Sequence, residues 1–198
     1  MATRHWTVRT AAFTAGVTAL AAFGWAPPAA AQSDEPQDGA WLVRNAEFEG
    51  ADSDGDARTY DPALVPEGSE VAVVESSGDG RTGVVIALHG MKPNRMYGVH
   101  VHTGKCGPKG DDAGPHYQNR KDPETPSVDP EYANRKNEVW LDLHTDPSGY
   151  ATASAKQKWL FRDGEAQSVV LHEHHTSTKP GEAGTAGDRL ACVNVPFE

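Results

Sequence analysis

The stretch Gly98-Val99-His100-Val101-His102 alternates histidine with small or aliphatic residues. In an extended strand, successive side chains point to opposite faces, so His100 and His102 share one face and the valines share the other. We expect the valines to pack into a core, which leaves the two imidazoles side by side on the opposite face. The stretch therefore predicts a β-strand that carries half of a metal site.

Two further histidines can supply the other half of this site. His116 follows a Gly-Pro corner at 114–115, and His172 ends the apolar run at 169–171. Four imidazole ligands, with no thiolate and no carboxylate among them, favour copper over magnesium, calcium or an iron–sulfur cluster, and zinc is the competing metal. The four histidines predict a metalloprotein with redox chemistry.

The N-terminal segment has the layout of a secretory signal peptide. Arg4 and Arg9 accompany an apolar stretch at 11–25, and three alanines at 29–31 form a small-residue cleavage motif. We expect cleavage near Ala31, which would export the mature chain. The apolar stretch is too short and too rich in small residues for a membrane anchor, and no other segment is apolar enough to span a bilayer. The sequence thus predicts a secreted, extracytoplasmic protein without membrane insertion.

The chain is acidic, with 18 Lys and Arg residues against 28 Asp and Glu residues and a formal net charge of −10. Residues 1–31 contain two arginines and no acidic residue, so their removal would leave a formal charge of −12. Such a surface repels nucleic acid and anionic membranes. Neither is therefore expected as a partner.

Cys106 and Cys192 are the only cysteines in the sequence. In an exported chain, a lone pair of cysteines favours a disulfide, and the rival interpretation is a pair of metal-binding thiolates. Because Cys106 stands four residues after His102, a disulfide would also fix the loop that follows the expected metal strand.

After the signal segment, the pattern is all-β. Short apolar or alternating runs are separated by turns rich in Gly, Asp, Pro and Ser, and no amphipathic helix stands out. Two long loops, at 103–136 and 173–188, are expected to carry function. We expect a sandwich or Greek-key barrel at 59–198, after a flexible acidic leader at 32–58 that can hold an extra strand. The expected strands are Trp41–Phe48, Glu70–Glu75, Thr82–His89, Met96–His102, Glu138–Thr145, Tyr150–Phe161, Gln167–His172 and Arg189–Val195.

Four motifs, in this order, resemble the copper/zinc superoxide dismutases. They are Gly-Val-His-Val-His at 98–102, Ala-Gly-Pro-His at 113–116, Val-Val-Leu-His-Glu at 169–173 and Ala-Gly-Asp-Arg-Leu-Ala-Cys at 186–192. The resemblance implies an eight-stranded Greek-key β-barrel and an enzyme that acts on superoxide. The residues that it implies are the copper ligands His100, His102, His116 and His172, the disulfide between Cys106 and Cys192, and Arg189 beside the copper to guide the anion.

The sequence departs from this family where zinc would bind. In the family, two more histidines and an aspartate in the loop after the second motif hold zinc, whereas the segment 117–139 contains no histidine here. The aspartate that normally follows the last copper histidine is also missing, and Thr176 stands near that place. The chain thus resembles the secreted copper-only branch of the family, which implies one copper per chain and no zinc.

Without zinc, another group must orient the outer nitrogen of His116, because histidine ligands usually donate to a neighbouring acceptor. Glu138 and Asp142, four residues apart on an expected strand, are the candidates, and the alternative is that either is an ordinary surface carboxylate. We expect His116 to release copper on reduction, take up a proton and deliver it as peroxide forms. Arg189 is expected to attract superoxide, and the alternative is that it pairs with a carboxylate on a solvated face.

The predicted function is a secreted copper-dependent superoxide dismutase, in which copper cycles between Cu(II) and Cu(I). Two alternatives remain: an extracytoplasmic copper-binding or storage protein with little turnover, and a zinc-bound or metal-free interaction domain on the same scaffold. The pattern is compatible with a monomer and with a homodimer. Of the other histidines, His89 and His144 are expected to be exposed, while His174 and His175 either face solvent or collect loose metal.

Overall fold

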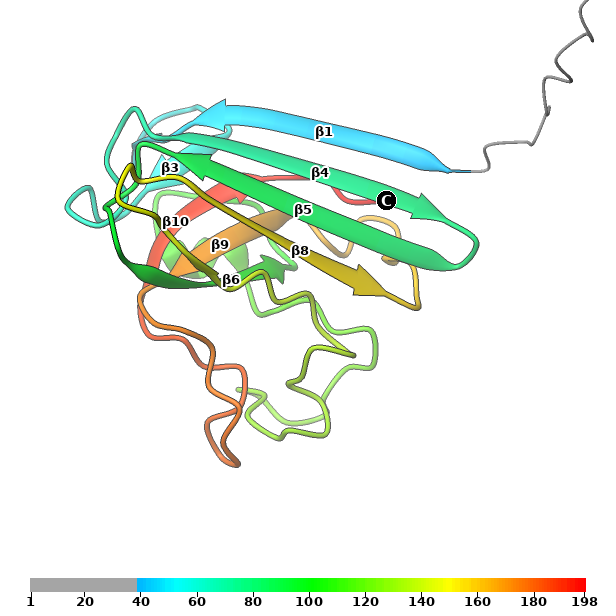
Figure 1. The fold of residues 1–198 in the computed structure, drawn as a ribbon. Helices are drawn as coiled ribbons and strands as arrows, with labels where there is room; N and C mark the ends of the chain where they lie inside the picture. The colour runs from blue at the N-terminus through cyan, green and yellow to red at the C-terminus, as the bar shows by residue number, and fades with distance from the viewer. Residues whose placement is uncertain (1–38) are drawn as a thin grey trace, which may run out of the picture. The chain divides into compact units, whose positions relative to one another are not determined.

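The computed structural model describes residues 39–198 (Figure 1). The predicted signal peptide and the first residues of the predicted leader lie outside the described residues. Within residues 39–198, no helix has the length and apolar composition needed to cross a membrane.

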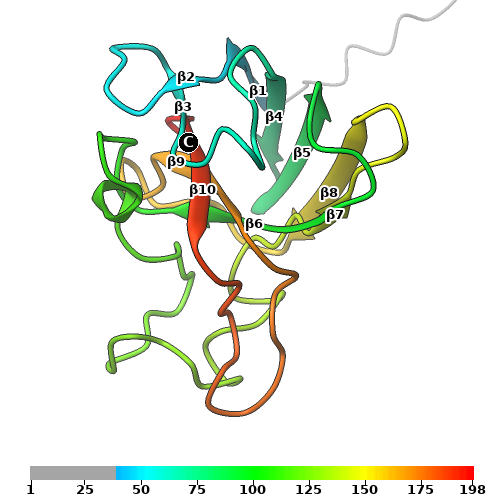
Figure 2. The same ribbon diagram turned by 90° about the vertical axis from the view of Figure 1, so that its left-hand side faces the viewer.

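Two β-sheets pack face to face (Figures 1 and 2). The first sheet is antiparallel throughout and has the order β1-β4-β5-β8. Its strands are β1 (Ala40–Glu47), β4 (Glu70–Gly78), β5 (Arg81–His89) and β8 (Ala151–Gln157). The second sheet has the order β2-β3-β10-β9-β6-β7. Its strands are β2 (Glu49–Gly50), β3 (Ala57–Thr59), β6 (Met96–His102), β7 (Leu143–His144), β9 (Ser168–His172) and β10 (Arg189–Asn194).

The all-β Greek-key fold expected from the sequence is confirmed. The sequence predicts eight strands, whereas residues 39–198 contain ten. The two additional strands, β2 and β3, are too short to show an alternating pattern in the sequence. One short 3₁₀ helix, η1 (Gly110–Ala113), lies in the first long loop. Both β1 and β3 pair with strands of the main fold, so the two sheets begin before residue 59, where we expected the domain to start.

The core lies between the two sheets and follows from strand alternation. On β5, Val84, Ile86 and Leu88 are buried and point inward, while residues between them are partly or fully exposed. The β4–β5 hairpin turns through Asp79 and Gly80, which both have positive φ, as the two-residue turns that match the strand twist require. Apolar residues from both sheets thus form one cluster.

Strand β6 is buried on both of its faces, and its outer face carries the two histidines of the expected metal strand. Tyr97, Val99 and Val101 belong to the core, whereas His100 and His102 point to the outer face of the second sheet. Figures 1 and 2 show that the two long loops extend from the same end of the fold. Because these loops cover the outer face of β6, its histidines are removed from solvent.

Two expected strands are shorter than predicted. Within the expected strand Glu138–Thr145, only Leu143–His144 pairs as a strand, and Trp140 makes an isolated bridge to His100. Its backbone bonds to β6 without forming a regular ladder, because Leu141 N donates to the Val99 oxygen at 2.7 Å and Val101 N donates to the Val139 oxygen at 3.4 Å. The expected strand at 150–161 ends at Gln157, whose side chain donates to the backbone oxygen of Glu138.

Candidate metal centre

The register of β6 and β9 brings three of the predicted histidines to one face. Gly98 lies opposite His172, and His102 lies opposite Ser168, so His100 and His172 are diagonal neighbours. The fourth histidine comes from the first long loop, where His116 makes an isolated β-bridge to His102.

The structure brings the four histidines together. One nitrogen of each ring lies within 4.8 Å of the corresponding atoms of the others, a spacing that could hold a metal ion. His102 Nε2 and His172 Nε2 are 3.2 Å apart. Among residues 39–198, this is the one group of three or more His, Cys, Asp or Glu residues with such a spacing.

In each of the four rings, one nitrogen lies near a protein oxygen and the other is available to a metal ion. In His100 the available nitrogen is Nδ1, which is buried and has no hydrogen-bond partner, as expected for an atom that binds a metal. The donor set therefore fits a metal that prefers imidazole, such as copper or zinc. The pairs are His100 Nε2 with Thr176 Oγ1 (2.6 Å), His102 Nδ1 with the Gly114 oxygen (2.9 Å), His116 Nδ1 with Glu138 Oε2 (2.9 Å) and His172 Nδ1 with the Gly187 oxygen (3.4 Å).

The environment favours the neutral form of three of these imidazoles, those of His100, His102 and His172. Burial, reinforced by the charge of His116, lowers the pKa of His100 and of His102 well below the usual range. Burial also lowers the pKa of His172 to about 3. A neutral imidazole keeps the lone pair that a metal ligand needs.

Glu138 is a buried carboxylate that accepts three hydrogen bonds. Besides His116, its partners are Gln118 Nε2 at 2.7 Å and Trp140 Nε1 at 2.6 Å. Three donors fix the orientation of the carboxylate, which in turn orients the His116 ring. The position of Glu138 excludes the alternative that it is a surface residue.

Asp142, the other candidate for orienting His116, lies beside a different histidine. Its Oδ1 accepts a hydrogen bond from Thr176 Oγ1 and lies 4.0 Å from His100 Nε2. Its Oδ2 pairs with Arg135 at 2.6 Å. Asp142 is also buried, so it too differs from an ordinary surface carboxylate.

Arg189 lies in the wall of a pocket that two of the four histidines also line. It is the first residue of β10 and lies opposite His172 in the β9–β10 register. Its guanidinium donates to the Gly110 oxygen at 2.9 Å, and its Nε lies 3.9 Å from the exposed Asp111 carboxylate. The pocket has a volume of about 1,120 Å³, and His116, His172 and Arg189 all line it.

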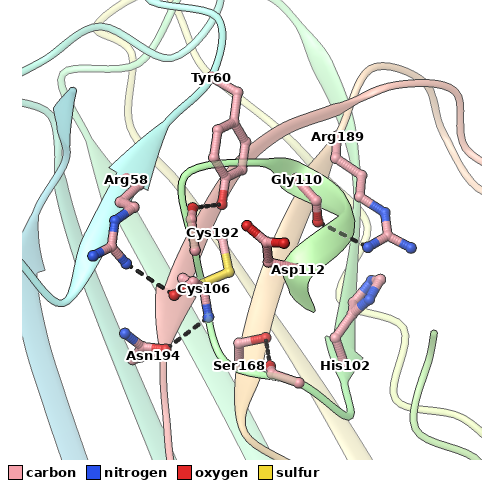
Figure 3. The surroundings of a disulfide bond; sticks show 12 residues. Arg58, Tyr60, His102, Cys106, Gly110, Asp112, Ser168, Arg189, Cys192 and Asn194 are labelled. Carbon is pink, nitrogen blue, oxygen red and sulfur yellow. Dashed lines mark hydrogen bonds between the residues drawn. A yellow bond between two sulfur atoms is a disulfide. The ribbon is translucent and has the colours of Figure 1, made fainter. Parts of the chain in front are cut away.

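Cys106 and Cys192 form a disulfide between β10 and the loop that follows β6 (Figure 3). Around it, Arg58 donates to the Cys106 oxygen at 2.9 Å, and Asn194 Oδ1 accepts from the Cys106 backbone N–H at 2.9 Å. These contacts fix the loop that contains η1. The disulfide thereby holds the Gly110 oxygen close to Arg189.

The remaining described histidines lie outside the cluster. His89 pairs with Glu70 on the exposed face of the first sheet, and His144 and His174 are exposed. His175 is half-exposed, and its Nε2 lies 3.7 Å from Asp142 Oδ2. Sequence reasoning did not single out three residues that bond to the site: Arg135, Gln118 and Trp140. No spacing signal marks them, because long loops bring them there.

The fold and the site define a class of protein: a two-sheet Greek-key β fold with four histidines converging outside one sheet. The family model for copper/zinc superoxide dismutase (SODC) matches residues 68–195. The chain belongs to this family, whose members bind copper and act on superoxide. The family expected from the sequence motifs is thereby confirmed.

Solved structures of low sequence identity are similar to this chain. The Cu/Zn superoxide dismutase from Brucella abortus is 20% identical, with a TM-score of 0.50, and the match covers 78% of this chain and 99% of that chain. A mutant of a SOD-like protein from Bacillus subtilis is 16% identical, with a TM-score of 0.48 and coverage of 66% and 90%. The clock protein EA4 is 22% identical, with a TM-score of 0.46 and coverage of 66% and 88%. None of the curated protein sequences matched this chain.

Proposed function

We propose that this protein is a secreted superoxide dismutase that uses one copper ion and no zinc. The observation that carries the proposal is the four-histidine cluster, in which one nitrogen of each ring is near a protein acceptor and the other belongs to the shared group. Four imidazole ligands suit copper. Copper in this site would take one electron from one superoxide and give one to a second, forming O2 and hydrogen peroxide.

Arg189 is the residue proposed to attract the substrate. Its guanidinium is a fixed positive charge in the wall of the pocket that His116 and His172 also line. In a chain with a net charge of −10, such a local charge concentrates a small anion at the pocket against the repulsion of the rest of the surface. A superoxide drawn to Arg189 therefore arrives next to the histidines.

His116 is the residue proposed to deliver a proton to peroxide. Glu138 accepts a hydrogen bond from the Nδ1–H group of His116, so Nε2 is the nitrogen of this ring that can face the metal centre. Nε2 cannot hold a metal ion and a proton at the same time, so His116 would take up the proton only after releasing the reduced metal. Because His116 lines the pocket, it could then pass that proton to an oxygen there, which is the role of a general acid. The second proton of hydrogen peroxide comes from water in the pocket.

The proposal excludes zinc because the outer nitrogen of His116 already has a partner. A histidine shared between copper and zinc would present this nitrogen to zinc, whereas here it bonds to Glu138. The segment 117–139 contains no histidine, and residues 39–198 contain no second ligand group of suitable spacing. Export is supported by the signal-peptide layout of residues 1–31 and by the disulfide, which persists in oxidising compartments.

The test is the decay of superoxide after pulse radiolysis, followed directly with copper-loaded and with metal-free protein. We expect second-order catalysis proportional to the bound copper, and none in the metal-free protein. If the four histidines bind copper but superoxide decays no faster than with metal-free protein, this is instead a copper-binding protein with little turnover. Replacement of His172 by Ala should abolish both copper retention and catalysis.

A further inference from the structure

A hydrogen-bond relay joins the surface to His100, one of the fully buried ligand candidates. Arg135 donates to Asp142 Oδ2 at 2.6 Å, Thr176 Oγ1 donates to Asp142 Oδ1, and Thr176 Oγ1 lies 2.6 Å from His100 Nε2. These contacts connect both long loops with β6. The relay, defined as Arg135, Asp142 and Thr176, has no part in the role proposed for Glu138.

The relay contains a buried carboxylate that needs hydrogen-bond partners. Only 2% of the Asp142 side chain is exposed, whereas 55% of the Arg135 side chain is exposed. A buried carboxylate without hydrogen bonds is unfavourable, and Arg135 supplies a hydrogen bond to Oδ2 of Asp142. Arg135 is itself fixed by the Trp140 oxygen at 3.1 Å and by the Trp140 ring, which its guanidinium covers at 5.5 Å.

Counting protons along the relay assigns the tautomer of His100. Both oxygens of Asp142 accept hydrogen bonds, Oδ2 from Arg135 and Oδ1 from Thr176, so the single hydroxyl proton of Thr176 points to Asp142. The Thr176 oxygen can then only accept from the ring, which requires a proton on Nε2 of His100. In that tautomer Nδ1 carries the lone pair, and Nδ1 is the buried atom without a partner among the four histidines.

Gly98 allows the relay to reach the sheet. A Cβ atom on Gly98 would lie 3.2 Å from Thr176 Oγ1 and 2.6 Å from the His174 oxygen. Since Gly98 and His100 share one face of β6, the missing side chain leaves room for the second loop directly above the strand. Thr176 can therefore approach His100 closely.

We propose that Arg135, Asp142 and Thr176 are positioning residues, which fix His100 in the Nε2–H tautomer with Nδ1 turned to the metal centre. The inference deepens the proposed function, because it explains how this ligand is oriented where the family's aspartate is replaced by Thr176. The tautomer is a property of the metal-free protein, so it can be tested separately from copper binding.

The first test is ¹⁵N NMR of the imidazole rings in metal-free protein labelled at histidine, with His100 assigned from a His100→Asn variant. We expect His100 as a single Nε2–H tautomer with a slowly exchanging ring proton. Thr176→Val should remove this signature, and Thr176→Ser should keep it. A wild-type His100 protonated on Nδ1, or a Thr176→Val spectrum equal to wild type, would overturn the relay.

Arg135→Met tests the charged end of the relay. It should move the His100 signals in the same direction as Thr176→Val, since Asp142 loses the donor that fixes its orientation toward Thr176. An unchanged His100 spectrum would remove Arg135 from the relay. The matched controls are Thr178→Val, an exposed threonine of the same loop, and Arg120→Met, which breaks an exposed ion pair with Glu131. Both controls should leave the His100 signals in place.

The second test is Cu(II) affinity, measured by competition with a chelator. We expect Thr176→Val to weaken binding about 10- to 100-fold, with Thr176→Ser close to wild type. Because both act through one relay, adding Arg135→Met to Thr176→Val should cause little further loss. Equal affinity of Thr176→Val and wild type would contradict the positioning role. A wild-type protein without Cu(II) affinity would refute the proposed function, while the NMR test would still decide the relay.

Discussion

His116 Nδ1 lies 2.9 Å from Glu138 Oε2, and only 2% of the Glu138 side chain is exposed. A loop histidine is thereby fixed by a buried carboxylate that also accepts from Gln118 and Trp140. The arrangement gives a single metal centre an oriented ligand without a second metal ion. Glu138 is therefore the residue on which the proposed absence of zinc depends most.

Glu138→Gln should weaken the centre. The glutamine keeps the size of the side chain but has one acceptor oxygen for three donors, so at least one buried donor loses its partner. We expect copper affinity or the rate with superoxide to fall about 10- to 100-fold. Glu131→Gln, at an exposed carboxylate of the same loop, is the control and should change neither. Wild-type affinity and rate in Glu138→Gln would remove Glu138 from the account.

Arg189→Ala should lower the rate while copper stays bound. The variant removes the fixed positive charge of the pocket wall but none of the four histidines. We expect the rate with superoxide to fall about tenfold or more and to depend less on ionic strength. Arg189→Lys keeps the charge and should retain part of the salt dependence. An Arg189→Ala protein with an unchanged rate would show that the arginine only pairs with its neighbours.

Gly98→Ala should displace the second long loop. A Cβ atom there would meet the His174 oxygen at 2.6 Å and Ala186 Cβ at 2.7 Å, closer than packed atoms tolerate. We expect a loss of about 1–3 kcal/mol in the free energy of unfolding, together with weaker copper binding. Gly39→Ala is the matched control, since its Cβ would lie 3.4 Å from the nearest atom. Equal unfolding curves for Gly98→Ala and Gly39→Ala would contradict the close packing.

Glu75 should make the stability of the metal-free protein depend on pH. It faces the core on β4, its Oε1 has no partner, and burial raises its pKa from 4.5 to about 7. Between these values the folded protein keeps a proton on Glu75 that the unfolded chain releases. This contribution to stability is therefore complete below pH 4.5 and is lost as the pH rises through 7.

The measurement is urea unfolding of wild type and Glu75→Gln across this range. The stability of the variant relative to wild type should grow by on the order of 2 kcal/mol between pH 5 and pH 8. Glu70→Gln, at an exposed position of the same strand, should show no such trend. A constant difference between Glu75→Gln and wild type would mean that Glu75 is ionised in the folded protein throughout.

Local patterns in the sequence predicted the elements that depend on local alternation. The strand Met96–His102 has the bounds expected from its histidine and valine spacing, because a two-residue period fixes which face each side chain takes. His116 and His172 could be added because each stands at the end of a recognisable motif. The short strands β2 and β3 could not be predicted from the sequence. They form because β3 pairs with β10, which is distant in the sequence, and β2 pairs with β3.

The surroundings of the ligands were only partly predictable. Glu138 and Asp142 were the two candidates for orienting His116, and Glu138 does lie next to it. Asp142 instead lies next to His100, which precedes Asp142 by 42 positions in the sequence. Thr176 reaches His100 across a separation of 76 residues. Such contacts depend on the paths of two long loops, which no short-range period describes.

The most direct test of the central claim is pulse radiolysis of superoxide with protein loaded with copper alone, and then with copper plus zinc, with metal content determined in each sample. The account predicts catalysis at one copper per chain, no stoichiometric zinc, and the same rate in both samples. Catalysis that requires bound zinc, or copper bound without catalysis, would contradict it.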